Sequence, residues 1–141
     1  MEVTSLVIRE IKEHGARAYP FEACGFVLGH FKNSGLVRGE KTLEAINSRQ
    51  GEKRRRRFNI EAEEFLAAER AAQSQGLDIL AIYHSHPDHP ALPSANDLEK
   101  ALPFYRYLIV KVENGQAKEL SCWLLANDRS GFLKQELTIL P

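Results

Sequence analysis

The stretch LDILAIYHSH, residues 77–86, constrains the fold more than any other part of the sequence. Apolar residues occupy both odd and even positions from Ile79 to Tyr83, so a strand formed here is apolar on both faces. Such a strand needs cover on both sides, and in α/β proteins helices supply it. We therefore expect an interior strand in a sheet that is flanked by helices.

Helical and extended patterns alternate along the rest of the chain. From Val3 to Ala18, apolar residues recur at spacings of three, four and seven, which predicts a helix that Pro20 ends. A second helix is expected from Asn59, a possible N-cap, to Gly76. The other expected elements are strands at 21–31 and 36–45 around a turn at 33–35, an exposed loop at 47–57, a short helix at 94–102, and strands at 105–112, 118–126 and 132–140. This order predicts a single α/β domain over residues 1–141, with a mixed, mostly antiparallel sheet flanked by helices.

Charge and cysteine content narrow the class of protein. The 141 residues carry 19 basic and 19 acidic side chains, so no net field favours nucleic acid or membrane as a partner. The longest apolar runs are too short to span a bilayer, and the first residues lack the pattern of an export signal. Two cysteines, Cys24 and Cys122, are too few for a disulfide-stapled fold and form no C-x-x-C pair. These features predict a cytoplasmic protein that binds neither nucleic acid nor membrane.

Two histidines at the end of the apolar strand indicate a metal site. His84 and His86 are two residues apart, so on a strand both imidazoles point to the same face, while Ser85 points to the other. The strand ends at Pro87, where a ligand has access. Two imidazoles bind a metal weakly, and a catalytic zinc site needs a third protein ligand with its fourth position left to water.

Asp97 is the candidate third ligand, and it has a competing interpretation. Ser94 and Asp97 form an S-x-x-D pattern, which is typical of a capping box at a helix start. Both interpretations suit Ser94, but they compete for the Asp97 carboxylate, which we expect to serve either the cap or the metal. The adjacent histidine pair favours the metal.

The segment HSHPDHPALPSAND fits H-x-H-x₇-S-x₂-D and resembles the signature of the JAMM (MPN-plus) zinc metallopeptidases. The segment FEACGFVLG resembles the part of that family that carries an upstream catalytic glutamate. The resemblance covers nearly the whole chain, and it implies the MPN fold, which is distantly similar to that of the cytidine deaminases. The deaminase motifs themselves, H-x-E and P-C-x-x-C, are absent.

The resemblance implies a role for each matching residue. His84, His86 and Asp97 would bind one catalytic Zn²⁺, Glu22 would be the general acid and base, and Ser94 would donate a hydrogen bond to the developing oxyanion. The implied activity is hydrolysis of an amide or isopeptide bond by a metal-activated water. A non-catalytic scaffold of the same fold is the alternative, although all five positions are filled here.

Within that family, the chain is most similar to the compact bacterial branch that trims a C-terminal residue from ubiquitin-like sulfur-carrier proteins, of the cysteine-biosynthesis type. The similarity lies in YHSHPDHPALPS, EACGFVLG and PFYRYLIVKVENG. It implies a ubiquitin-like sulfur-carrier protein as substrate and leaves the carrier, the released residue and the oligomeric state open.

Three further features have more than one interpretation. The basic run Lys53–Arg57 is typical of a solvated loop, or it binds an acidic face of a small carrier protein. His89 lies in a proline-containing loop and is expected at the surface or lining the substrate site. Asp88 is a candidate to orient a histidine ring.

Overall fold

The computed structural model describes all 141 residues, which form one eight-stranded sheet with three α-helices. In chain order the elements are β1 (Glu2–Thr4), α1 (Ser5–Ala18), β2 (Cys24–Phe31), the 3₁₀ turn η1 (Asn33–Gly35), β3 (Val37–Ala45), the 3₁₀ turn η2 (Gly51–Arg55), α2 (Ala62–Ser74), β4 (Asp78–Pro87), α3 (Ala95–Lys100), β5 (Arg106–Glu113), β6 (Gln116–Leu125), β7 (Phe132–Gln135) and β8 (Thr138–Leu140). The strand order is β7-β6-β5-β4-β2-β3-β1-β8, and four of the seven pairings are antiparallel. The expected mixed α/β sheet is therefore confirmed.

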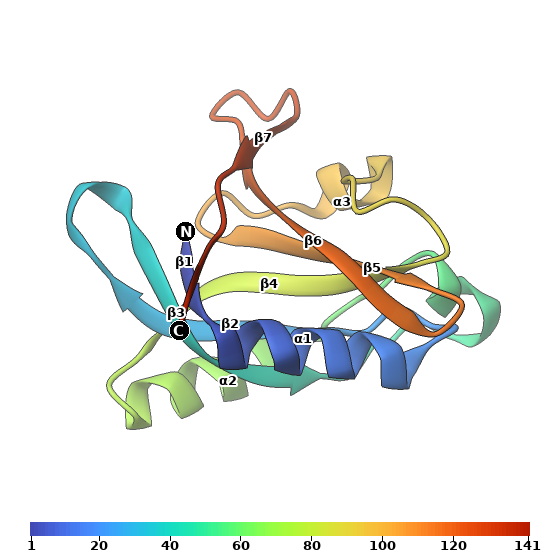
Figure 1. Ribbon diagram of the computed structural model, residues 1–141, viewed down its shortest axis with the longest axis horizontal. Coiled ribbons are helices and arrows are strands. Elements are labelled where there is room, and N and C mark those ends of the chain that lie inside the picture. The colour runs from blue at the N-terminus through green and yellow to red at the C-terminus, as the bar shows by residue number, and fades with distance from the viewer.

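Strand β4 lies in the interior of the sheet, as its apolar pattern predicts. It pairs antiparallel with β2 and parallel with β5, and every residue from Ile79 to Pro87 is buried. In Figure 1, α1 crosses one face of the sheet and α2 lies on the other side of β2 and β4. Ala81 and Tyr83 pack in the hydrophobic cluster that includes α1, whereas Ile82 packs in the cluster that includes α2. His84 and His86 follow Ile82 at intervals of two, so they belong to the α2 side.

Helix α1 ends before Pro20 as expected, but it begins at Ser5 and not at Val3, because Val3 and Thr4 belong to β1. The Thr4 hydroxyl accepts a hydrogen bond from the backbone N of Val7 at 3.4 Å, which caps the first turn. Val7 and Ile11 are buried against the sheet, and the helix ends at Ala18, two residues before Pro20. None of the three helices combines the length and the apolarity that a bilayer crossing requires.

The C-terminal strand prediction is wrong in one respect. Residues 132–140 do not form one strand, because β7 pairs with β6 at one edge of the sheet and β8 pairs with β1 at the opposite edge. Strand β1 was not expected at all, since Glu2–Thr4 is too short to carry a periodic pattern. Its one apolar residue, Val3, is fully buried between β3 and β8.

The predicted start of α2 is also wrong. Asn59 is not the N-cap, because the helix begins at Ala62 and Glu61 takes the cap position. The Asn59 side chain instead donates to Ser48 Oγ at 2.8 Å, and its backbone N donates to Asn47 Oδ1 at 3.2 Å. Asn59 thus fastens the loop of residues 47–57, which is mostly exposed as expected but contains the 3₁₀ turn η2.

Candidate functional site

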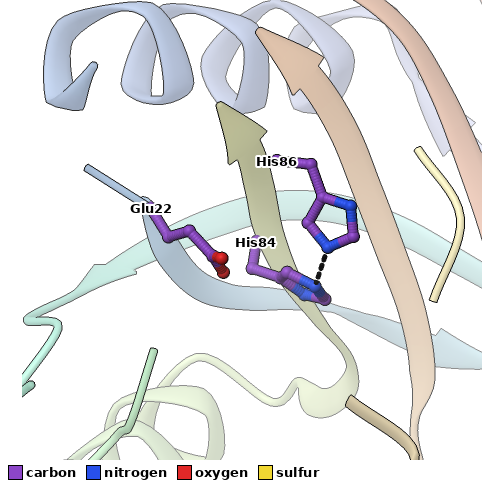
Figure 2. Close-up of side chains that lie close together, drawn as sticks. All are labelled: Glu22, His84 and His86. Carbon is purple, nitrogen blue, oxygen red and sulfur yellow. Dashed lines mark hydrogen bonds between the residues drawn. The ribbon is translucent and has the colours of Figure 1, made fainter. Parts of the chain in front are cut away.

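The two histidines of β4 meet with their Nε2 atoms facing each other. His84 and His86 are each 1% exposed, and their Nε2 atoms lie 3.1 Å apart (Figure 2). Both rings project from the same side of the strand end, as the spacing predicts. Two imidazole nitrogens at this distance both need either a shared proton or a shared cation.

Asp97 lies directly opposite this pair. Its Oδ1 is 3.2 Å from His84 Nε2, and its Oδ2 is 3.2 Å from His86 Nε2. Burial by itself raises the pKa of this carboxyl, but the two imidazoles and the Ser94 backbone amide outweigh burial and hold that pKa well below its usual range. Asp97 is therefore a carboxylate that faces two neutral or cationic rings inside the protein.

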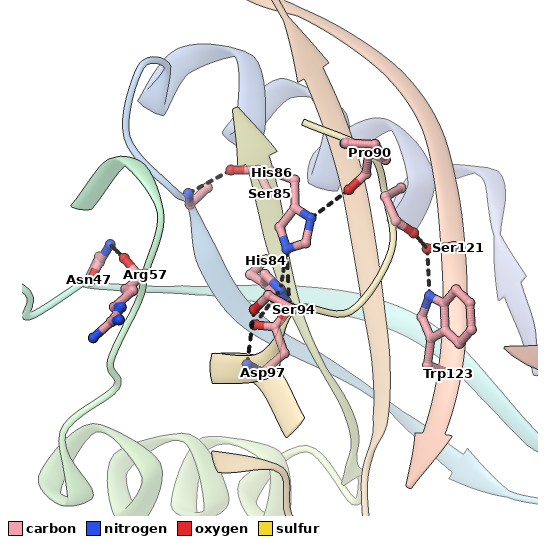
Figure 3. A network of polar contacts seen from close by, with 12 residues as sticks. Asn47, Arg57, His84, Ser85, His86, Pro90, Ser94, Asp97, Ser121 and Trp123 are labelled. Atoms are coloured by element: carbon pink, nitrogen blue, oxygen red, sulfur yellow. Dashed lines mark hydrogen bonds and ion pairs between the residues drawn. The ribbon is translucent and has the colours of Figure 1, made fainter. Parts of the chain in front are cut away.

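Asp97 also caps α3, and it does so while both of its oxygens face the histidines. The Ser94 backbone N donates to Asp97 Oδ2 at 2.8 Å, and the Asp97 backbone N donates to Ser94 Oγ at 3.0 Å (Figure 3). Because each carboxylate oxygen has two lone pairs, the cap leaves Asp97 able to bind a cation as well, and metal binding by Asp97 stays a prediction. The capping box fixes the side-chain rotamer that aims Asp97 at the histidines.

The surroundings of the two rings decide which nitrogens remain free. His86 Nδ1 donates to the Pro90 carbonyl at 2.7 Å, which leaves Nε2 of the neutral ring with a lone pair directed at the site. His84 Nδ1 is buried without a hydrogen-bond partner, and the ring stacks on Phe58 with centroids 4.6 Å apart. The sequence motif did not reveal Phe58 or Pro90, because neither occupies a position that carries chemistry of its own.

Glu22 lies just before β2 and not on the expected strand, which begins at Cys24. Its carboxylate extends toward His84 in Figure 2, is buried, and has no hydrogen-bond partner on either oxygen. Burial, and then the negative charge of Asp97, raise the pKa of Glu22 to about 9. An unpartnered buried carboxyl is unfavourable for folding, so its position calls for a ligand or a proton.

The backbone around Glu22 is held from two sides. Glu22 N donates to the Arg54 carbonyl at 2.6 Å, and Asn47 Nδ2 donates to both the Glu22 carbonyl at 3.2 Å and the Arg57 carbonyl at 3.0 Å. On the other side, Ala23 N donates to Ser85 Oγ at 2.8 Å. Ser85 thus points away from the histidines, as predicted, and helps to position the glutamate.

These groups fit a divalent cation. Two ligand atoms bound to a tetrahedral zinc ion at about 2.0–2.1 Å lie about 3.3 Å apart. The three distances among His84 Nε2, His86 Nε2 and the Asp97 oxygens are 3.1, 3.2 and 3.2 Å. Glu22 forms a second candidate set with the two histidines, whose ligand atoms all lie within 4.8 Å of one another. The structure therefore brings all five predicted site residues to one place, and two three-residue ligand sets are geometrically possible.

A comparison with protein families decides the affiliation of the chain. The profile of the prokaryotic homologs of the JAB domain matches residues 4–126. The chain belongs to this family. Its resemblance to the JAMM metallopeptidases is thereby confirmed at the level of the family.

Two relatives of this JAB protein are named for cleaving protein conjugates. The chain is 31% identical over 106 residues to a desampylase of Haloferax volcanii, a match that covers 73% of this chain and 71% of that one. It is 44% identical over 52 residues to the probable TtuB-protein conjugate cleaving protease of Thermus thermophilus. That second match covers 37% of this chain and only 35% of the relative's length.

Solved structures share the fold of this JAB protein over its whole length. The solution structure of a Salinibacter ruber protein is 45% identical, with a TM-score of 0.79, and the match covers 99% of this chain and 92% of that one. A JAB1/MPN domain protein from Archaeoglobus fulgidus has a TM-score of 0.63 at 18% identity and matches 100% of both chains. The second likeness establishes the fold alone.

Two cavities lie next to the candidate metal ligands of this JAB protein. The first, which we call the apolar pocket, has a volume of about 300 Å³ and is lined mainly by Phe58, Ile60, Phe65, Ile82, His84 and Asp97. The second, which we call the basic pocket, has a volume of about 560 Å³ and is lined mainly by Pro20, Arg55, Arg56, Asp88, His89 and Ser94. The apolar pocket reaches His84 and Asp97 directly, whereas the basic pocket reaches only Ser94 among the five predicted site residues.

The two residues that follow Pro87 have different surroundings. His89 is half-buried, its ring stacks on that of His86 with centroids 4.1 Å apart, and it lines the basic pocket. Asp88 does not orient a histidine, so that expectation is wrong. It accepts hydrogen bonds from the Tyr19 hydroxyl and from the Asn114 backbone N, and thus ties the end of β4 to α1 and to the β5–β6 turn.

Proposed function

We propose that this JAB protein is a zinc-dependent peptidase that hydrolyses an amide or isopeptide bond at the C-terminus of a ubiquitin-like protein. The observation that carries the proposal is the cluster of two buried imidazoles and one carboxylate at mutual distances of 3.1–3.2 Å, beside a buried carboxyl that has no partner. The names of the relatives from Haloferax and Thermus support conjugates of ubiquitin-like proteins as the substrate class. The proposal treats residues 1–141 as one domain, because both hydrophobic clusters pack on the same sheet.

We assign His84, His86 and Asp97 as the metal ligands. Each Asp97 oxygen lies 3.2 Å from a histidine Nε2 atom, which is close to the separation of two ligands on one zinc ion, and the capping box holds the carboxylate there. A zinc ion bound to these ligands supplies a Lewis acid that lowers the pKa of water to about 7 and polarises a carbonyl.

Glu22 is the proton carrier in this proposal. Its carboxyl is neutral without a nearby cation, because burial raises its pKa to about 9. A divalent cation close by favours the carboxylate, which is the form that accepts a proton from the attacking water. Once protonated, the same oxygen delivers the proton to the amide nitrogen as the C–N bond breaks, so Glu22 returns to its starting state.

Ser94 donates a hydrogen bond to the oxyanion in this proposal. Its Oγ accepts a hydrogen bond from the Asp97 backbone N, so its own hydroxyl hydrogen is free to donate. A well-placed donor of this kind contributes about 3 kcal/mol to transition-state stabilisation. No covalent bond to the enzyme is required at any step.

The finer part of the proposal is the substrate, for which we propose a sulfur-carrier protein of ubiquitin-like fold that bears an extra C-terminal residue. The test incubates purified zinc-loaded protein with such carriers and with conjugates of ubiquitin-like proteins, and identifies the products by mass spectrometry. We expect release of the C-terminal residue or the conjugated partner by the wild type and none by Glu22→Gln.

The matched control for this test is Glu119→Gln, which removes an exposed carboxylate on β6 and should cleave like the wild type. Both variants should contain as much zinc as the wild type. A Glu22→Gln protein with normal turnover would refute the assigned proton carrier. Wild-type protein that binds no divalent metal and cleaves nothing would leave the scaffold alternative in place.

A further inference from the structure

The basic pocket lies on the Glu22 side of the metal-binding groups. Pro20, which lines it, is two residues before Glu22, and the backbone carbonyl of Arg54 accepts a hydrogen bond from Glu22 N at 2.6 Å. The next two residues along the chain, Arg55 and Arg56, are in the pocket wall. The loop that positions the proposed proton carrier therefore also supplies two cations beside it.

The arginines of this loop differ in how far they are already engaged. The Arg54 guanidinium lies 3.9 Å above the Phe21 ring centroid and its Nε donates to the Gly51 carbonyl at 3.1 Å. Arg55 forms an ion pair with Glu52. Arg56 makes no side-chain hydrogen bond and no ion pair, although it lines the pocket. It is the cation that is available for a ligand.

The one acidic residue of the pocket wall, Asp88, has donors on both oxygens. The Tyr19 hydroxyl donates to its Oδ2 and the Asn114 backbone N donates to its Oδ1 at 2.9 Å. These hydrogen bonds keep its pKa below the usual range, so it stays negative and retains some repulsion toward an anion. Because Glu52 pairs with Arg55 and both oxygens of Asp88 have donors, Arg56 is the one charged side chain of the wall that has no partner.

Ser94 connects this pocket to the reaction site. It lines the basic pocket, and its Oγ and backbone N both contact Asp97, which in turn faces the two histidines. Because Glu22 delivers its proton to the departing nitrogen, the leaving group must lie on the Glu22 side when the C–N bond breaks. The leaving group and the basic pocket are thus on the same side.

We propose that the basic pocket, through Arg56, binds a carboxylate on the leaving group, as in a substrate from which a single residue with a free α-carboxylate departs. This inference rests on the proposed function and deepens it, because it separates two substrate classes. A C-terminal residue brings an α-carboxylate two bonds from the departing nitrogen, whereas the lysine side chain of an isopeptide conjugate brings none there. The pocket favours removal of a terminal residue.

The test measures binding apart from cleavage. A fluorescein-labelled peptide that ends in Gly-Gly-Ala is prepared with a free C-terminal carboxylate and, as its neutral counterpart, with a C-terminal carboxamide. Fluorescence anisotropy gives the Kd of each for zinc-loaded Glu22→Gln protein, which does not turn the peptide over. We expect the carboxylate form to bind about five- to tenfold more tightly, with the ratio decreasing in high salt.

The second arm adds Arg56→Gln to this background, which should reduce the ratio of the two Kd values to near one. Arg57→Gln is the matched control, because Arg57 is on the same loop but does not line the pocket, and it should leave the ratio unchanged. A third peptide that ends in an aspartate carboxamide tests whether a side-chain carboxylate is accepted in place of the α-carboxylate.

Three results would overturn the inference: a ratio near one in the Glu22→Gln background, a ratio that Arg56→Gln does not change, or no measurable binding of either peptide. The proposed function is tested separately by kcat/KM of the wild type on the same pair of peptides. Arg56-dependent binding of the carboxylate form without cleavage would contradict the peptidase assignment and leave the anion site supported. Cleavage without any dependence on the carboxylate would support the peptidase assignment and contradict the anion site.

Discussion

The effect of zinc on thermal stability can distinguish the two possible ligand sets. Asp97→Asn and Glu22→Gln each remove one carboxylate from the site with almost no change in side-chain size. If the ligands are His84, His86 and Asp97, only the first variant should lose affinity for zinc. The Asn side chain retains an oxygen that can accept the hydrogen bond from Ser94 N, so weakening of the helix cap should cost less than about 1 kcal/mol of stability.

The size of the effect follows from mass action. Free zinc at about 100 times its Kd stabilises the folded wild type by about 2.7 kcal/mol. For a chain of this length that corresponds to a rise in Tm of roughly 5–10 °C. A hundredfold loss of affinity in Asp97→Asn reduces the stabilisation at the same zinc concentration to about 0.4 kcal/mol, or about 1 °C.

Differential scanning fluorimetry of chelator-treated protein, with and without added zinc, measures this shift. Asp78→Asn is the matched control, since Asp78 is an exposed carboxylate at the opposite end of β4 and should keep the full shift. We expect Glu22→Gln to keep it as well. The reverse pattern, with the shift lost in Glu22→Gln and kept in Asp97→Asn, would show that Glu22 is the third ligand and would refute the assigned roles.

Three further predictions concern the site and the fold. Ser94→Ala should lower Tm by a few degrees through loss of a cap worth about 1 kcal/mol, and should lower kcat about a hundredfold; unchanged kcat would remove its oxyanion role. Gly29→Ala should abolish soluble expression, because its Cβ would lie 1.9 Å from the Arg38 carbonyl oxygen, whereas Gly131→Ala meets no atom within 4 Å and should fold normally. Burial lowers the pKa of His14 below 6.5, so as the pH falls the unfolded chain binds a proton at His14 before the folded protein does. The stability that comes from keeping His14 neutral is therefore complete above about pH 6.5 and declines as the pH falls. Urea unfolding at pH 7.5 and 5.5 should therefore show a smaller pH dependence for His14→Gln than for the wild type.

The parts of the fold that the sequence predicted are those in which one segment carries its own signal. The two-sided apolar run of β4, the single apolar face of α1 and the H-x-H spacing each report a local property, and each was confirmed. The start of α2 was wrong because Asn59 has a side chain that suits an N-cap equally well as a loop. Hydrogen bonds that Asn59 donates to Ser48 and Asn47 of the loop decide between these uses, and they join residues that are 11 and 12 positions apart.

The edges of the sheet could not be predicted, because short strands depend on partners far along the chain. Thr138–Leu140 pairs in parallel with Glu2–Thr4, and neither segment has enough residues for a periodic signal. At Asp97 the cap and the histidine contacts occur together, although the sequence pattern presents the cap and the metal site as alternatives. A sequence pattern assigns one role to each carboxylate, whereas the two oxygens of Asp97 contact the Ser94 amide and both imidazoles at the same time.

The position of Glu22, 62 residues before His84, follows from strand pairing. Strands β2 and β4 are antiparallel with Cys24 opposite His84, so the chain just before β2 lies beside the end of β4. Ser85 N donates to the Ala23 carbonyl at 3.0 Å and Ala23 N donates to Ser85 Oγ, which extends this pairing by one residue and directs Glu22 toward the histidine side. Sequence distance between the glutamate and the histidines is thus free to vary with the loops, while the register of two strands fixes their separation in space. For this reason Ser85, which points to the face opposite the two histidines, helps to position Glu22 beside them.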